Sequence, residues 1–213
     1  MNEILDKYPA LEPCLESIER AYFFIEDTYH QGGKVLTCGN GGSAADAEHI
    51  VGELMKGFMK KRKLPETMRA RLIARFPGEG AYLADHLQGS LPAISLASQV
   101  SLMTAIANDV AADMVFAQQV YGYGRAGDTL IAISTSGNSQ NVLNAVRVAR
   151  TLSLHTIGLT GLSGGALRDI FGVTICAPGK NTPEVQEYHL PIYHYLCARI
   201  EAKFFAEATA RNG

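Results

Sequence analysis

The chain has 213 residues, of which 47% are hydrophobic and 19% charged, and its formal net charge is −2. This is the composition of a globular protein with a substantial core, and it gives no global electrostatic reason to expect nucleic acid or an anionic membrane as a partner. No stretch approaches the roughly 18 consecutive apolar residues of a membrane-spanning helix. The four cysteines lack CxxC spacing, so we expect reduced thiols and a cytoplasmic location.

Strand-like and helix-like segments alternate along the chain. Five short apolar runs have the continuous hydrophobicity of buried parallel strands; they are residues 34–38, 92–97, 129–134, 155–160 and 173–177. The expected helices are residues 11–29, 43–59, 98–107, 112–122, 138–152 and 183–208. The alternation predicts one α/β domain over residues 1–213. We expect a doubly wound, Rossmann-like or flavodoxin-like fold with a five-stranded parallel sheet and added N- and C-terminal helices.

Residues 60–89 interrupt this alternation. A basic run at 60–63 is followed by apolar residues at four-residue steps from Met68 to Phe76, which indicates a short amphipathic helix. A second helix is expected at 81–87. We therefore predict a helical insertion whose apolar face packs on a neighbouring element or subunit. The basic run is most typical of a solvated helix start, with phosphate or nucleic-acid binding as the alternative.

The first predicted strand ends in a glycine-rich turn, CGNGGS at residues 38–43. Ser43 with Asp46 three residues later fits a capping box, which places a helix N-terminus at this turn. Its free N–H groups and positive dipole end would face a ligand above the sheet. The same glycines fit the dinucleotide pattern GxGxxG/A, but the second strand ends without the acidic residue that such a site requires. We expect no nucleotide cofactor.

The third predicted strand ends in a turn rich in hydroxyl groups. Four of them lie within six residues, at Ser134, Thr135, Ser136 and Ser139. Hydroxyl donors and helix-terminal amides together suit a phosphate monoester without Lys or Arg. Ligands of such sheets bind at the carboxyl ends of the strands. An ordinary polar loop would account for one or two of these hydroxyls, so four favour a phosphate site.

Two helical pairs carry groups suited to acid–base chemistry. His49 and Glu53 are four residues apart and share a helix face, while Gln186 and His194 are eight apart on the last predicted helix. The four side chains could converge on one metal ion or one substrate. On spacing alone, the first pair is more often a solvated ion pair. Pro191 is expected to kink the last helix.

Together these features resemble the phosphoheptose isomerase branch of the sugar isomerase (SIS) domain superfamily. The matching blocks are CGNGGSAADAEHIVGEL (38–54), AIAND (105–109), GDTLIAISTSGNSQNV (127–142), IGLTG (157–161) and VQEYHLPIYH (185–194). The resemblance covers nearly the whole chain outside residues 60–89. It implies a three-layer α/β/α subunit of a homo-tetramer, or of a dimer, with active sites between subunits. Members of this branch isomerise sedoheptulose 7-phosphate to D-glycero-D-manno-heptose 7-phosphate through an enediol(ate).

The resemblance also implies roles for individual residues. Glu53 matches the catalytic base and His194 the acid. The residues matching those that bind the phosphate or the sugar are Asn40, Gly41, Gly42, Ser43, Asp109, Ser134, Thr135, Ser136, Ser139 and Gln186. Those matching the zinc ligands of some members are His49, Glu53, Gln186 and His194.

Two other functions remain open at this level. The first is a non-catalytic SIS protein, either a phosphosugar sensor or an adaptor for the bacterial replication initiator. The adaptor branch lacks a Glu at the position of Glu53, so the presence of Glu53 favours the enzyme. The second, nucleic-acid binding through the basic run at 60–63, is the least favoured.

Overall fold

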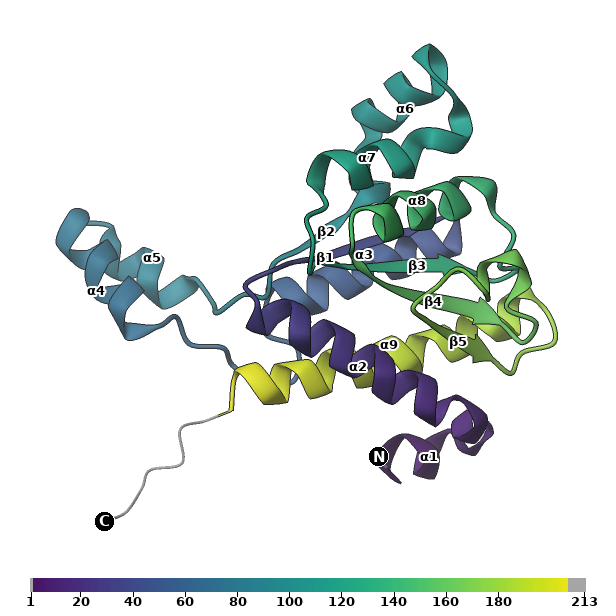
Figure 1. The fold of residues 1–213 in the computed structure, drawn as a ribbon. Coiled ribbons are helices and arrows are strands. Elements are labelled where there is room, and N and C mark those ends of the chain that lie inside the picture. The colour runs from purple at the N-terminus through teal and green to yellow at the C-terminus, as the bar shows by residue number, and fades with distance from the viewer. Residues whose placement is uncertain (1, 207–213) are drawn as a thin grey trace.

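A five-stranded parallel sheet forms the centre of the structure, a computed structural model that describes residues 2–206 (Figure 1). Its strand order is β2-β1-β3-β4-β5. The strands are β1 (Val35–Gly39), β2 (Ala93–Ser95), β3 (Thr129–Ser134), β4 (His155–Gly161) and β5 (Val173–Ala177). All five lie within a residue or two of the predicted runs, and the doubly wound α/β fold is confirmed. Continuous apolar runs predicted them because both faces of this sheet are buried.

Helices cover the two faces and give three layers (Figure 1). Alternate residues of β1 serve opposite cores: Val35 belongs to one hydrophobic cluster, Leu36 and Cys38 to the other. The first face carries α1 (Asn2–Lys7), α2 (Leu15–His30), α3 (Gly42–Met55) and α9 (Thr182–Phe204), and the second carries α6 (Val100–Asp109), α7 (Val115–Tyr123) and α8 (Gln140–Thr151). Short 3₁₀ helices occupy Pro9–Cys14, Leu96–Ser98, Ala112–Met114 and Gly165–Leu167.

The strand order places β1 beside β3, with Val35 level with Thr129 and Gly39 level with Ile133. From β1 the chain crosses to β2 on one side, and after β3 it continues to β4 on the other side. This reversal is the switch point at which doubly wound sheets bind their ligands. The glycine-rich turn and the hydroxyl-rich turn both lie at this point.

Several helix boundaries differ from the prediction by two to four residues; α2, for example, begins at Leu15 and not at residue 11. α3 ends at Met55, four residues before the expected end, and Lys56 is already extended. α9 ends at Phe204, and residues 207–208 of the predicted range lie outside the described residues. Pro191 lies inside α9 and does not end it.

The segment 60–89 forms a helical hairpin that extends away from the sheet (Figure 1). Its helices are α4 (Glu66–Arg75) and α5 (Gly80–His86), close to the predicted positions. No residue of α4 is buried in this chain. The basic run does not start a helix, because α4 begins only after Pro65. Lys60, Lys61 and Lys63 are exposed as predicted, but Arg62 is just 2% exposed.

Arg62 is buried because it forms an ion pair with Glu201 near the end of α9. The Arg62 Nε–Glu201 Oε1 distance is 2.8 Å, and both side chains are fully inaccessible to solvent. The carboxylate also accepts hydrogen bonds from the backbone N–H groups of Phe58, Met59 and Lys60. Burial alone would raise the pKa of Glu201, but these hydrogen bonds and Arg62 outweigh it and hold the pKa below its ordinary value.

No helix within residues 2–206 has the length and apolarity needed to cross a bilayer. All four cysteines are free thiols. Burial raises the pKa of Cys38 to about 12, and burial is also the main reason why the pKa of Cys197 rises to about 12.

The lowered pKa of Glu201 predicts a specific pH dependence of stability. Glu201→Gln should reduce the free energy of unfolding by about 3–5 kcal/mol at pH 7, because it leaves the Arg62 charge buried without its partner. The difference between wild type and variant should be complete above the ordinary carboxyl pKa of 4.5 and should shrink as the pH falls below it. Urea unfolding at several pH values between 7 and 3 measures this. A difference that stays constant over that range would contradict the prediction.

Candidate active site

The glycine-rich turn connects β1 to α3 without a side-chain cap. Gly41 is the N-cap, with φ of +57°, and α3 begins at Gly42. The predicted capping box was therefore wrong: Ser43 lies inside the first helical turn, is 4% exposed, and donates its backbone N–H to Asn40 O at 3.0 Å. The positive φ of Gly41 turns the chain by itself. The N–H groups of Ala44 and Ala45 are bonded to Gly41 O, so in the first turn the N–H of Gly42 stays available to a ligand.

A reciprocal pair of amides joins the two turns across the switch point. Asn40 Nδ2 donates to Asn141 Oδ1 at 2.9 Å, and Asn141 Nδ2 donates to Asn40 Oδ1 at the same distance. Asn141 belongs to the first turn of α8, and Asn40 to the turn after β1. The starts of α3 and α8 are thereby held side by side.

The hydroxyl-rich turn brings its predicted residues together. Ser134 Oγ donates to Ser139 Oγ at 3.1 Å, and Ser136 Oγ accepts the backbone N–H of Asn138 at 3.2 Å. Ser139 is the N-cap of α8. Gly137 has φ of +66°, and a Cβ there would lie 2.0 Å from Gly164 O, so only glycine fits.

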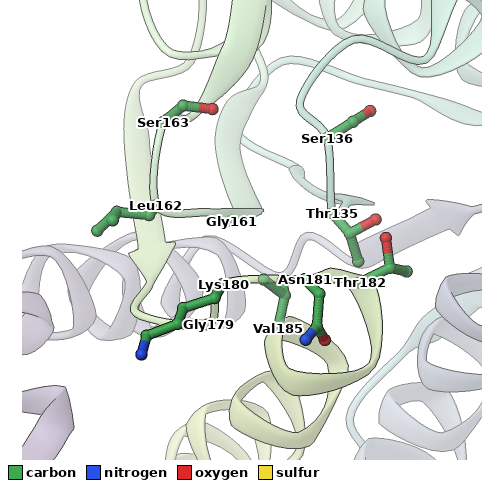
Figure 2. A pocket seen from close by; sticks show the side chains of 10 residues that line it. All are labelled: Thr135, Ser136, Gly161, Leu162, Ser163, Gly179, Lys180, Asn181, Thr182 and Val185. Atoms are coloured by element: carbon green, nitrogen blue, oxygen red, sulfur yellow. The ribbon is translucent and has the colours of Figure 1, made fainter.

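A cavity of about 480 Å³ opens beside this turn. Figure 2 shows Thr135 and Ser136 on one side and Leu162 and Ser163 on the other. The start of α9 closes the cavity, with Asn181 capping the helix by accepting the backbone N–H of Glu184 at 3.0 Å. The lining is thus rich in hydroxyls and backbone polar groups at the carboxyl ends of β3, β4 and β5.

Gln186 on α9 contacts the glycine-rich turn. A Cβ built on Gly42 would lie 2.4 Å from Gln186 Nε2. Glycine at position 42 therefore makes room for this amide, and Gln186 lies with the turns and not with the other three residues expected to converge with it.

The acid–base residues form a second cluster, between α3 and α9. His49 Nε2 lies 3.1 Å from Glu53 Oε1, and the His49 and His194 rings are 5.0 Å apart. Glu53 is only 8% exposed, whereas the His49 side chain is 43% exposed, so the pair joins a buried carboxylate to an imidazole that solvent reaches. Glu53 Oε2 and His194 Nε2 are buried, and neither has a hydrogen-bond partner within the described chain. Lys56 Nζ lies 3.7 Å from that carboxylate oxygen.

The environment of His194 disfavours its charged form. Burial is the main cause that lowers its pKa below 6.5, the neighbouring His49 adds to this, and Glu53 opposes it. The imidazole is therefore mainly neutral at neutral pH and can donate one proton and accept another.

Two residues of this cluster escaped the sequence prediction. Tyr193 Oη lies 2.9 Å from His49 Nδ1 and donates to Asp46 Oδ1 at 3.3 Å. Burial raises the pKa of Asp46, while Tyr193 and His49 lower it less. Asp46 lies three residues before His49, on the same helix face, and this spacing was the one available signal.

The predicted site residues thus separate into two groups. Ser43 and Glu53 are ten residues apart on α3, or about 15 Å along its axis. Gln186 and His194 are eight apart on α9, about 12 Å. Asp109 joins neither group, since it lies exposed at the end of α6 and accepts a hydrogen bond from Asn108 at 2.8 Å.

The proposed zinc ligands are divided in the same way. Within residues 2–206, no group of three or more His, Cys, Asp or Glu side chains is arranged to hold a metal ion. His49, Glu53 and His194 nevertheless lie together, and the two buried atoms without partners, Glu53 Oε2 and His194 Nε2, are donors of the type that zinc binds. Gln186 of the same chain is too far along α9 to join them.

Known proteins resemble this chain in sequence and in fold. The model of the SIS domain family matches residues 3–74 and 81–161. Because this match includes most of residues 60–89, leaving that segment out of the resemblance was too narrow. The chain is 40% identical to a phosphoheptose isomerase of a Roseiflexus species, with 86% of this chain and 80% of the relative covered. It is 42% identical to that of Thiobacillus denitrificans, with 93% and 87% covered.

Solved structures of phosphoheptose isomerases have the same fold. The Neisseria gonorrhoeae protein superposes with a TM-score of 0.73 at 34% identity, covering 94% of each chain. That of Francisella tularensis gives 0.75 at 32% identity, covering 93% of this chain and 92% of the other.

Gly137 allows a test of how the hydroxyl-rich turn is built. Gly137→Ala should lower the free energy of unfolding by about 3 kcal/mol or more. The cost of a positive φ for alanine and the cost of the clash between its Cβ and the Gly164 backbone add together. Gly32→Ala is the matched control: φ is +74° but a Cβ would meet nothing within 4 Å, so the expected loss is about 1 kcal/mol. Urea unfolding of both variants decides, and equal losses would show that the contact with Gly164 does not constrain the turn.

Proposed function

The chain belongs to the SIS domain family and, within it, to the phosphoheptose isomerases, and from this we propose that it converts sedoheptulose 7-phosphate to D-glycero-D-manno-heptose 7-phosphate. The observation that carries the proposal is the buried Glu53 carboxylate, whose Oε2 has no hydrogen-bond partner in the described chain, close to the neutral His194. A buried base beside a group that can both give and accept a proton is what an aldose–ketose isomerase needs.

The reaction moves a carbonyl group from C2 to C1. Glu53 takes a proton from C1 of the ketose while His194 gives a proton to O2, which produces an enediol. His194 then recovers a proton from O1, and the protonated Glu53 returns its proton to C2. Each side chain gains and loses one proton in total, so both return to their starting protonation states. Partial burial of both groups excludes water from the intermediate.

The two turns would hold the phosphate end of the substrate. Ser134, Thr135, Ser136 and Ser139 supply hydroxyl donors, and the start of α8 supplies free N–H groups with the positive end of the helix dipole. Asn40, Ser43 and Gln186 lie beside them and would orient the sugar hydroxyls. Lys180 is the one cationic side chain among the described residues that line the cavity beside these hydroxyls.

Zinc is part of the proposal. His49, Glu53 and His194 would hold it, and Gln186 of a second copy would complete the set. A bound zinc ion polarises a carbonyl group and stabilises the negative charge of an enediolate. The residue roles given above for proton transfer do not depend on it.

We further propose that the protein acts as a homo-oligomer, a tetramer in its family's manner, with active sites between subunits. The support is the separation of about 15 Å between Ser43 and Glu53 along α3, which exceeds the length of an extended seven-carbon sugar phosphate. A phosphate held by one copy would meet the acid–base cluster of another. Exposed apolar side chains offer contact area: Phe23, Met59, Met68, Phe76, Tyr82 and Leu87. The four free thiols support a cytoplasmic location.

The role of Glu53 gives the first functional test. Glu53→Gln should lower kcat by about 10³-fold while phosphosugar affinity stays within a few-fold, because the amide keeps the shape but cannot take a proton. Glu48→Gln, an exposed carboxylate on the same helix that accepts a hydrogen bond from Ser98, is the control and should keep full turnover. NMR detection of aldose formation and calorimetric binding of the substrate measure both quantities. If the wild-type protein binds the phosphosugar but does not convert it, the result would instead indicate a phosphosugar sensor.

Zinc binding is tested independently of turnover. Equilibrium dialysis followed by metal analysis should give one zinc per site in the wild type and at least about tenfold weaker binding in His49→Ala. His155→Ala, which removes a surface histidine paired with Asp27, should bind zinc as the wild type does. Equal zinc binding by all three proteins would refute the metal site.

A further inference from the structure

The connection after α3 is built around one buried arginine. Arg62 lies in the non-helical segment between α3 and α4, and its side chain is fully inaccessible to solvent. All three nitrogens of its guanidinium group donate hydrogen bonds: Nε to Glu201 Oε1 at 2.8 Å, Nη1 to Leu54 O at 2.5 Å and Nη2 to Glu53 O at 2.7 Å. The ring of Phe205 covers it, 4.7 Å from the guanidinium carbon.

Two of these bonds go to the last turn of α3. The final carbonyl groups of a helix have no partner within the helix. Arg62 supplies partners for the carbonyls of Glu53 and Leu54. Arg62 therefore caps the C-terminus of α3 with its side chain. One of the two carbonyls that it binds belongs to Glu53, the proposed base.

Glu201 extends the same contact to α9. Its carboxylate accepts three consecutive backbone N–H groups, those of Phe58, Met59 and Lys60, at 2.7–3.0 Å. Glu201 follows His194 by seven residues, two turns along the same side of α9. The Phe58 ring packs against the His194 ring at 5.3 Å between centroids. One ion pair thus contacts the surroundings of both proposed proton-transfer groups.

We propose that the Arg62–Glu201 pair is a positioning device that sets Glu53 against His194 for proton transfer. The inference rests on the proposed isomerase function. Stability alone is a weak reason for this arrangement, because a buried ion pair is often no more stabilising than apolar residues of similar volume. The pair instead fixes the orientation of the two helices. The planar guanidinium holds two carbonyls of α3 and one carboxylate of α9 in a single plane.

The test uses Arg62→Lys, which keeps the charge but removes the planar fork, and Glu201→Gln, which keeps the shape. Asp128→Asn is the matched control. Asp128 is also a buried carboxylate, and it accepts hydrogen bonds from Lys34 N, Lys34 Nζ and Arg125 N. It precedes β3, at the amino end of the central strand, and these partners belong to neither α3 nor α9. Each variant is measured for urea unfolding, for kcat and KM separately, and for the side-chain nitrogen NMR shifts of His49.

All three variants should lose stability, but only Arg62→Lys and Glu201→Gln should lose at least about tenfold in kcat, a barrier change of about 1.4 kcal/mol. Their KM values should stay within about twofold, because the turns lie at the other end of α3. The His49 Nε2 signal, which reports the contact with Glu53, should shift in these two variants and stay unchanged in Asp128→Asn.

Other outcomes overturn the proposal. Loss of kcat in Asp128→Asn equal to that in the Arg62 and Glu201 variants would mean that kcat follows stability alone. Failure of both variants to fold while Asp128→Asn folds would assign the pair to stability. If the wild type turns over no substrate, the proposed function fails, and the His49 shifts still decide the positioning role: unchanged shifts in Arg62→Lys refute it.

Discussion

The path of α3 limits everything else in this molecule. The turn at Gly41 sends the chain from the carboxyl end of β1 back along one face of the sheet. The N-terminus of the helix therefore lies at the switch point, beside the Asn40–Asn141 pair. Glu53 lies at the other end of the helix, near the amino ends of the strands. Since a helix is rigid over three or four turns, the two ends cannot approach each other. Anion binding and proton transfer are separated by the geometry of a single element.

α9 repeats this division on the neighbouring helix. Its beginning carries Gln186 against Gly42, and its middle carries His194 against His49. The two helices pack on the same face, so each end of one lies level with the matching end of the other. Proton transfer between Glu53 and His194 depends on how accurately the two helices are aligned. The buried contact between Arg62 and Glu201 controls that alignment.

The local parts of this architecture could be predicted from the sequence, and the distant pairings could not. Parallel strands buried on both faces are continuous apolar runs, and the four hydroxyls after β3 are neighbours in the chain. The partner of Arg62 is 139 residues away, and that of His49 is 144 away at Tyr193. A basic residue inside a basic run carries no sign that it will be buried. The Ser43–Asp46 spacing was misleading for a different reason, because the conformation of Gly41 made a side-chain cap unnecessary.

The free cysteines have a consequence for how the layers open. Cys38 belongs to the core under α6, α7 and α8, and Cys197 to the core under α2, α3 and α9. Their pKa values of about 12 leave almost no thiolate at neutral pH, and burial blocks access to alkylating reagents. Each thiol therefore reacts only when its own layer separates from the sheet. The ratio of the alkylation rates of Cys38 and Cys197 shows whether the two helical layers open independently or the whole protein unfolds at once.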